Sequence, residues 1–512
     1  MYKHLLSVGG FTLLSRITGF LRDVMLGAIL GAGLAADAFV IAFRLPNHFR
    51  AIFGEGAFNA AYVPTYSQVL EKGGNAQARQ FSSQIFTLLL ISQIVLLAVA
   101  WMFMPQIVTL LAPGFKDDPE KFALAITLTR ITFPYLLMVT LVTLLSGTLN
   151  AHRQFAVAAF APVLLNLAMI GALALAFLFP SAGHAAAAGV LLAGALELGL
   201  LIFAAIKSGV MAKIVRPRFG PNVKRFFTVL GPAVIGSAGV QIAMFADTII
   251  ASLLPTGSVS SIYYADRIYQ LPIGVIGIAA GTVLLPEMSR RFASGDKDGA
   301  FHAQNRTLAL TLVLTAPFAV AFLTIPDVIM RGVFLRGQFS ADAAMASANV
   351  LAAYGFGLMA IVGIRSAVAS FQAQGDTKTP MMISLGAVAV NVALKFTLYQ
   401  SLGAVGLAFA TAVGAWVNVI LLTVLAIKRG SMYPDGLLGK IAGATVIASV
   451  ILGLCAVLME IPLLRLVAKI GHFPFELHLV MMGGIGLAIY AGVLLIMLKA
   501  FDVSLASLRR KT

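Results

Sequence analysis

The sequence has little charge and almost no cysteine for its length. Only 11% of the 512 residues are charged, and Cys455 is the single cysteine. One cysteine excludes an internal disulfide and any metal site built from several thiolates. Soluble domains carry roughly a quarter of charged residues, so this composition excludes an ordinary soluble protein. No long polar segment interrupts the chain, which leaves no room for a separate soluble domain.

Hydrophobic residues make up 60% of the chain and fall in long continuous runs. Runs of roughly 20 apolar residues predict membrane-spanning helices, whereas a membrane barrel needs strict alternation. The predicted fold class is therefore an all-α polytopic membrane protein with about 14 transmembrane helices. The expected spans are 5–30, 34–65, 82–111, 122–149, 157–180, 184–207, 226–254, 258–289, 305–325, 346–373, 379–400, 404–427, 438–461 and 477–501.

The basic residues are distributed unequally between the two sides of the membrane. Of 36 lysines and arginines, 22 fall in loops and tails on the side of the N-terminus, 6 fall on the other side, and 8 lie inside spans. The six on the other side include Lys121. This bias predicts that both termini are cytoplasmic. The net charge of +16 is therefore explained by the orientation of the chain in the membrane and does not indicate a nucleic-acid partner.

Weak internal repeats recur at nearly one offset. The segment Ala204–Gly209 matches Leu425–Gly430 at an offset of 221, and Asn166 matches Asn391 at an offset of 225. Six spans fit into this offset, and an even number keeps both copies in the same orientation. We therefore expect two six-helix lobes, related by an axis along the membrane normal, with the substrate between them and alternating access by rocking. The expected divisions are 1–215, 220–430 and 435–512, the last holding two extra helices.

Eight cations lie inside predicted spans, where each costs roughly 2.5–3.5 kcal/mol at the bilayer centre if it faces lipid. They are Arg16, Arg22, Arg44, Arg50, Arg130, Arg267, Arg365 and Lys395. They are expected to face water, acids or substrate. We assign no role to Arg130 and Arg365.

Helical phase gathers several of these charges on common faces. Residues seven apart return to nearly the same face, so Ser15 lies with Arg22 and Asp37 lies with Arg44. Arg16 and Asp23 share the face adjacent to that of Ser15 and Arg22. The arginines outnumber the nearby acids, which are Asp23, Asp37, Glu55 and Asp266. A surplus of guanidinium groups in a water-filled cavity predicts an anionic substrate. The alternative is a closed ion-pair network that only holds the helices together.

A second polar group lies in two later spans. Asp247 occupies the seventh span, and Asn391 lies one helical turn before Lys395 in the eleventh. Lys395 could neutralise Asp247, or Asp247 and Asn391 could bind a cation or relay a proton.

Sequence signatures of catalysis are absent. The seven histidines are scattered without metal-ligand spacing, and neither a phosphate-binding GxxxxGK[ST] loop nor a nucleophile elbow occurs. We therefore expect no metal, no cofactor and no enzymatic activity, which leaves transport as the leading activity.

Several segments closely resemble the MurJ/MviN family of the MOP exporter superfamily. They are Ser15–Asp23 (SRITGFLRD), Ala36–Asn47 (ADAFVIAFRLPN), Phe53–Phe58 (FGEGAF), Ala112–Phe115 (APGF), Phe160–Asn166 (FAPVLLN), Tyr263–Arg267 (YYADR) and Gly281–Pro286 (GTVLLP). Together they cover essentially the whole chain. The resemblance implies a lipid II flippase of the bacterial inner membrane, which moves undecaprenyl-diphosphate-linked peptidoglycan precursor from the cytoplasmic to the periplasmic leaflet.

The resemblance also implies a central cationic cavity for the diphosphate-sugar head. The arginines that it assigns to this cavity are Arg16, Arg22, Arg50 and Arg267, with Asp37, Arg44, Ser15, Asn47 and Glu55 as supporting polar positions. The last two helices would form the groove for the polyprenyl tail. Some relatives bind sodium near the positions of Asp247 and Asn391, but Lys395 lies where such a site needs an oxygen. A tethered ammonium is therefore expected to replace the metal.

Three alternatives stay open. The first is another MOP-type exporter, for a polyprenyl-linked oligosaccharide. The second is a membrane enzyme acting on lipid-linked sugars, for which the acidic outer loop at Asp117, Asp118 and Glu120 is the only candidate. The third is a scaffold for cell-wall enzymes. The expected partners of a flippase are lipid II, membrane lipids and the cell-wall synthesis machinery, and the chain is expected to act as a monomer.

Overall fold

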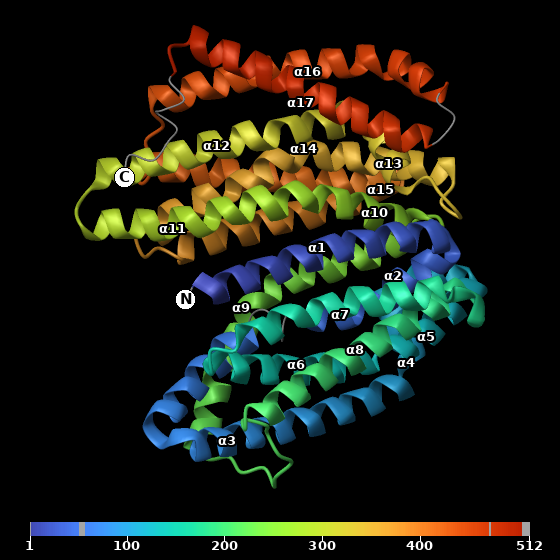
Figure 1. Cartoon of the computed structure of the whole chain (residues 1–512), viewed down its shortest axis with the longest axis vertical. Helices are drawn as coiled ribbons and strands as arrows, with labels where there is room; N and C mark the ends of the chain where they lie inside the picture. Colours follow the sequence, from blue (N-terminus) through green and yellow to red (C-terminus); the bar gives the residue numbers. More distant parts are fainter. Residues whose placement is uncertain (1, 51–56, 470–472, 504–512) are drawn as a thin grey trace. The chain divides into compact units, whose positions relative to one another are not determined.

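A computed structural model describes residues 2–50, 57–469 and 473–503, and within these ranges the chain is helical, without strands (Figure 1). The helices are α1 Tyr2–Leu30, α2 Leu34–Arg50, α3 Ala57–Met102, α4 Met104–Leu111, α5 Pro119–Thr132, α6 Pro134–Ala151, α7 Phe155–Ala174, α8 Ala182–Lys207, α9 Pro221–Ser252, α10 Ser258–Pro272, α11 Ile278–Ala293, α12 Lys297–Thr324, α13 Pro326–Phe334, α14 Ala341–Gln372, α15 Lys378–Lys428, α16 Gly436–Ala468 and α17 Pro474–Ala500. The predicted all-α class is confirmed.

Ten helices in the described part of the chain are long and apolar enough to cross a membrane. The count of about fourteen spans stays a prediction. One of the ten, α15, covers two predicted spans, and it is broken between them at Gly403, whose φ of 56° only glycine adopts at little cost. The interval between the predicted spans 34–65 and 82–111 is helical on both sides of a break at Gly74 within α3.

Proline sets two further breaks. The expected span 122–149 is divided at Phe133, directly before Pro134, into α5 and α6. The expected span 258–289 is interrupted after Pro272 by a π turn, Ile273–Gly277. Proline cannot donate the helical backbone hydrogen bond, so the ladder rearranges around it.

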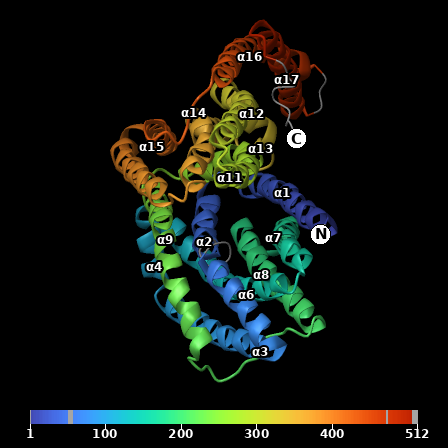
Figure 2. The same cartoon turned by 90° about the vertical axis from the view of Figure 1, so that its left-hand side faces the viewer.

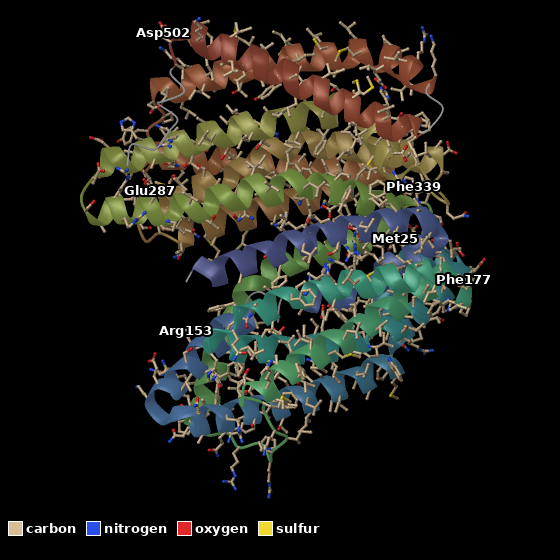
Figure 3. The ribbon with its side chains drawn as sticks, viewed as in Figure 1. Met25, Arg153, Phe177, Glu287, Phe339 and Asp502 are labelled. Atoms are coloured by element: carbon tan, nitrogen blue, oxygen red, sulfur yellow. The ribbon has the colours of Figure 1, made fainter. Side chains whose placement is uncertain are left out.

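The chain forms two compact units, residues 1–260 with 337–339, and residues 261–336 with 340–512. Aromatic side chains dominate the core of the first unit. The buried Tyr62 ring of α3 lies 5.3 Å from the Phe58 ring and 6.3 Å, edge-on, from Phe226 of α9. This contact places α9 beside α3 (Figure 2). At the two ends of α7 lie Arg153 and Phe177 (Figure 3).

The short segment 337–339 belongs to the first unit because it packs against the turn between α1 and α2. Gly31 closes that turn with a φ of 68°, and the backbone N–H of Gln338 donates to the carbonyl of Ala28 at 2.8 Å. A Cβ on Gly31 would lie 2.6 Å from the carbonyl oxygen of Gln338. Only glycine therefore fits this turn.

In the second unit, α12, α16 and α17 share a core that includes Leu452, Tyr490 and Leu494. The Tyr490 hydroxyl donates to the Val313 carbonyl of α12 at 2.7 Å. Other faces of α16 and α17 expose leucines, such as Leu458, which suits contact with lipid. The two six-helix lobes were predicted from an internal repeat. The division into compact units does not measure internal symmetry, so these lobes stay a prediction.

Candidate functional site

Arg22 of α1 is held in a buried polar cluster of the first unit. Its Nε and Nη2 donate to Asp23 Oδ1 at 3.1 and 2.8 Å, and its Nη1 donates to Asn166 Oδ1 of α7 at 3.0 Å. The Asn166 amide nitrogen in turn donates to the Ser15 carbonyl at 2.8 Å and to Thr18 Oγ1 at 3.1 Å. Asn166 thus joins Arg22 to the backbone carbonyl of Ser15, and no contact of the Ser15 side chain is involved.

A glycine makes room for this cluster. A Cβ on Gly19 would lie 3.3 Å from the amide nitrogen of Asn166, so a larger residue would press on the group that orients Arg22. Arg22 keeps 8% of its surface exposed and Asp23 keeps 4%. Arg16, by contrast, is exposed, although it lies seven residues before Asp23.

Asp37 of α2 is completely buried and makes several strong contacts. Its carboxylate lies 3.0 Å from the Lys121 ammonium of α5. It also accepts hydrogen bonds from the backbone N–H groups of Gly257 and Ser260, each at 2.8 Å, and from Ser260 Oγ at 2.7 Å. The charge of Asp37 is therefore balanced by Lys121. The assignment of Lys121 to an outer loop was wrong, because this side chain is 3% exposed and stacks on the Phe115 ring.

The other site residues of α2 lie toward its C-terminal end. Arg44 donates through Nη1 to Thr248 Oγ1 of α9 at 2.8 Å, and its carbonyl lies 2.9 Å from His48 Nδ1. Arg50 donates through Nε to Asn47 Oδ1 at 3.3 Å. Both arginines are half-buried. Glu55 lies outside the described residues.

Arg267 belongs to α10 in the second unit. Its Nη2 lies 3.5 Å from Asp266 Oδ2, and its guanidinium stacks over the Tyr263 ring at 4.7 Å. About a third of each charged side chain is exposed, 31% for Arg267 and 28% for Asp266. Partial exposure leaves donors of this arginine able to reach a ligand.

The second polar group is divided between the two compact units. Asp247 is half-buried on α9 of the first unit. On α15 of the second unit, Lys395 is 2% exposed, and Asn391 Oδ1 is buried without a hydrogen-bond partner among the described residues. The described residues contain no cluster of three histidine, cysteine, aspartate or glutamate side chains that could hold a metal.

Sequence reasoning missed three buried polar residues. Asn166 was noted in a repeat and in a family motif but given no structural role, and Lys121 was noted only as a loop charge. Glu197 of α8 was not considered, although it is 3% exposed and accepts a long hydrogen bond from the Tyr135 hydroxyl at 3.5 Å. A glutamate or asparagine within an apolar span is itself a signal, because such residues are expensive in lipid.

The site of the first unit is rich in positive charge. The described parts of α1 and α2 contribute Arg16, Arg22, Arg44 and Arg50 against two aspartates, and one of these, Asp37, is already balanced by Lys121. Guanidinium groups in this excess are suited to bind phosphate oxygens through paired N–H donors.

Solved structures define the class of protein. The chain superposes on a multidrug resistance MATE family transporter of the MOP superfamily, in an inward-facing conformation, with a TM-score of 0.68 and 15% identity over 83% of this chain and 97% of that one. It also superposes on "Lipid II flippase MurJ, inward closed conformation" with a TM-score of 0.79 and 24% identity over 97% and 99% of the two chains. These likenesses establish a polytopic helical transporter fold.

Sequence comparisons identify the family. The family model described as "Lipid II flippase MurJ" matches residues 26–473. A protein of Rhizobium meliloti (strain 1021) named "Probable lipid II flippase MurJ" is 44% identical over 84% of this chain and 81% of its own length. The "Lipid II flippase MurJ" of Burkholderia cenocepacia is 34% identical over 89% and 90% of the two chains. This chain belongs to the MurJ family, and the resemblance found in its motifs is confirmed.

Proposed function

We propose that this chain is a lipid II flippase that carries the diphosphate-linked precursor from the cytoplasmic to the periplasmic leaflet of a bacterial inner membrane. Family membership over residues 26–473 supports the substrate. The site supports the binding chemistry, and one observation carries it: Lys121 balances Asp37, so this carboxylate does not offset the arginines of α1 and α2.

In this proposal Arg16, Arg22, Arg50 and Arg267 bind the diphosphate and its sugars. The supporting polar positions are Ser15, Asp37, Arg44, Asn47 and Glu55. Asn166 and Asp23 hold the Arg22 guanidinium in a fixed orientation, so less conformational entropy is lost when phosphate binds. Rocking of two lobes would then expose the site to each side in turn. Both termini are cytoplasmic, and the chain performs no covalent chemistry.

Complementation tests this function. The wild-type chain is expected to rescue a bacterium depleted of its own lipid II flippase, whereas Arg22→Ala and Arg267→Ala are expected to fail at equal membrane levels, measured by blotting. Arg429→Ala is the matched control, because this arginine pairs with Asp376 on the surface and its loss should leave rescue intact. Rescue by both site variants would show that these two arginines have only a structural role.

A second outcome separates the nearest alternative. Failure of the wild-type chain despite good insertion would favour an exporter of another polyprenyl-linked oligosaccharide. Transport of that class would use the same cationic chemistry.

Ion or proton coupling without bound sodium is proposed for Asp247, Asn391 and Lys395. The Lys395 ammonium takes the place that a metal ion would occupy, so sodium is not bound there. Thermal stability of the purified protein should be equal in sodium and in choline chloride. Stabilisation by sodium would contradict this role of Lys395.

A further inference from the structure

A cavity of about 480 Å³ opens in the second unit, where the end of α11 meets the starts of α12 and α16. Its polar lining comprises Glu287, Arg291, His302, Asn305, Arg306, Thr307 and Asp435. Leucines and other apolar residues form the rest of the wall, among them Leu310, which is 37% exposed. The cavity is therefore amphipathic, and none of its residues belongs to the arginine site.

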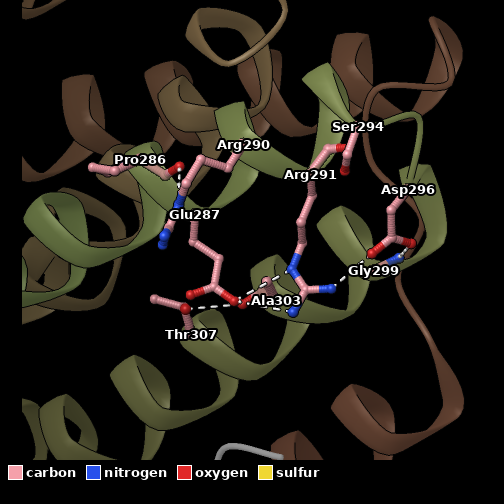
Figure 4. A network of polar contacts seen from close by, with 9 residues as sticks. All are labelled: Pro286, Glu287, Arg290, Arg291, Ser294, Asp296, Gly299, Ala303 and Thr307. Carbon is pink, nitrogen blue, oxygen red and sulfur yellow. Dashed lines mark hydrogen bonds and ion pairs between the residues drawn. The ribbon is translucent and has the colours of Figure 1, made fainter. Parts of the chain in front are cut away.

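The acids of this cavity already have polar partners. Glu287 Oε1 lies 3.1 Å from Arg291 Nη2, and Arg291 Nη1 lies 2.8 Å from Asp296 Oδ2, so one guanidinium bridges two carboxylates (Figure 4). Asp435 accepts a hydrogen bond from the Leu438 backbone N–H at 2.8 Å and lies 3.3 Å from His302 Nδ1. Each carboxylate of the cavity wall therefore already has a hydrogen-bond or ion-pair partner.

Arg306 carries a positive charge that is not paired with an acid among the described residues. This half-buried side chain lines the cavity, and it has no hydrogen-bond or ion-pair partner among the described residues. A half-buried guanidinium without an acid favours an anionic ligand, for which it offers a fork of donors.

Asn305, the neighbouring residue, supplies an unsatisfied acceptor. It is 3% exposed, and its Nδ2 donates to the Tyr433 carbonyl at 2.7 Å. A carbonyl can only accept, so the amide nitrogen must face it and the orientation of the amide is fixed. Its Oδ1 is then left without a partner in the described structure. Because an unmet buried acceptor is costly, a ligand that brings an N–H or O–H donor satisfies it.

We propose that this cavity binds a glycerophospholipid of the cytoplasmic leaflet whose headgroup carries a hydrogen-bond donor, such as phosphatidylethanolamine. The phosphodiester contacts Arg306, the headgroup amine donates to Asn305 Oδ1, and the acyl chains lie along the exposed apolar wall at Leu310. A soluble anion would leave that wall unused. The site is separate from the flippase site and does not depend on its substrate.

The choice of lipid tests the headgroup contact without altering the protein. Purified wild-type protein is titrated with dioleoyl-phosphatidylethanolamine, with dioleoyl-phosphatidylcholine and with inorganic phosphate, and bound lipid is counted by native mass spectrometry. Phosphatidylcholine has the same phosphodiester but no headgroup donor. We expect it to bind about 5- to 30-fold more weakly, the factor for one hydrogen bond to a buried group. Equal binding of the two lipids, or binding of phosphate as tight as that of lipid, would overturn the proposal.

Variants place the lipid in this cavity. Arg306→Gln is expected to weaken both lipids about tenfold, and Leu310→Trp, which fills the apolar wall, is expected to block them without disturbing the polar network. Arg290→Gln is the matched control, because Arg290 is an exposed arginine nearby that does not line the cavity. Equal effects of the two glutamine variants would show only general attraction to basic residues and would refute the site. Lipid II binding that depended on Arg306 in the same way would refute it as well.

Discussion

The Lys121 ammonium and the Asp37 carboxylate, 84 residues apart in the chain, lie 3.0 Å from each other with their side chains 4% and 0% exposed. Asp37→Asn keeps the shape of the side chain but leaves Lys121 as an unpaired buried charge. Breaking such a pair costs about 3–5 kcal/mol, so the variant should unfold at a clearly lower temperature. Thermal unfolding of the purified protein, followed by circular dichroism, measures the effect.

A surface pair provides the control for this experiment. Arg336 Nη2 lies 3.1 Å from Glu476 Oε1, with side chains 39% and 34% exposed. An exposed pair contributes at most about 1 kcal/mol, so Glu476→Gln should change the midpoint little. Adding Lys121→Met to Asp37→Asn should restore part of the lost stability. Equal shifts for Asp37→Asn and Glu476→Gln would contradict a strong buried pair.

Two glycines with almost equal φ angles are expected to respond differently to substitution by alanine. Gly31 and Gly74 have φ values of 68° and 70°, but only Gly31 has a backbone oxygen 2.6 Å from a built Cβ, while Gly74 has open space. Gly74→Ala should cost about 1–3 kcal/mol from backbone strain alone, because its ψ of −177° places it in a region that almost only glycine adopts. Gly31→Ala adds a collision with Gln338 and should lower the amount of folded protein in membranes much further. Similar losses at the two positions would argue against the collision.

Substitution of the uncharged residue Asn166 is expected to reduce transport. Asn166→Ala removes one of the groups that orient Arg22, and a hydrogen bond to a charged group is worth about 1.5–3 kcal/mol. We expect transport to fall about tenfold or more at normal membrane levels, measured as the expression needed for rescue. Asn418→Ala is the control, since Asn418 donates only to Ser384 Oγ, at 3.3 Å, in the second unit. Full rescue by Asn166→Ala would show that Arg22 needs no such support.

Acid should destabilise the turn after α6. Burial lowers the pKa of His152 from its ordinary value of 6.5, and its Nε2 lies 2.9 Å from the Tyr66 hydroxyl. The unfolded chain then binds a proton more readily than the folded one, so stability falls as pH drops below about 6.5 and continues to fall toward the lower folded pKa. His152→Gln should flatten this part of the profile of thermal midpoint against pH. Parallel profiles of the two proteins would contradict the assignment.

Local contacts of the site followed from the sequence, whereas distant ones did not. Helical phase predicts that Ser15 and Arg22 share a face, because a period of 3.6 residues fixes positions within one helix. Arg16 and Asp23 also share a face of α1, but their surroundings differ. Asp23 is buried beside its neighbour Arg22, while Arg16 is exposed. Phase gives the direction of a side chain from its own helix axis, but not which helix packs there.

The pairing of Asp37 with Lys121 could not be read from the chain for the same reason. Hydropathy places Lys121 near the end of a span, and nothing local says that α5 packs against α2 at that depth. A helix division was also missed where proline interrupts an apolar run, at Pro134, whereas the break at Gly403 falls between two predicted spans. Composition shows that a segment is apolar, but it does not show where the backbone hydrogen bonds of the helix are interrupted.

The π turn at Ile273–Gly277 holds one residue more than a turn of α-helix would. Each residue of an α-helix advances roughly 100° around the axis, so this single residue sets the rotation of everything after it. Deleting it would leave Arg267 where it is and swing Glu287 and Arg291 more than a quarter of a circle away from α12. This one extra residue therefore sets the direction, around the helix axis, in which the phospholipid cavity lies. It is found six to ten positions after Arg267.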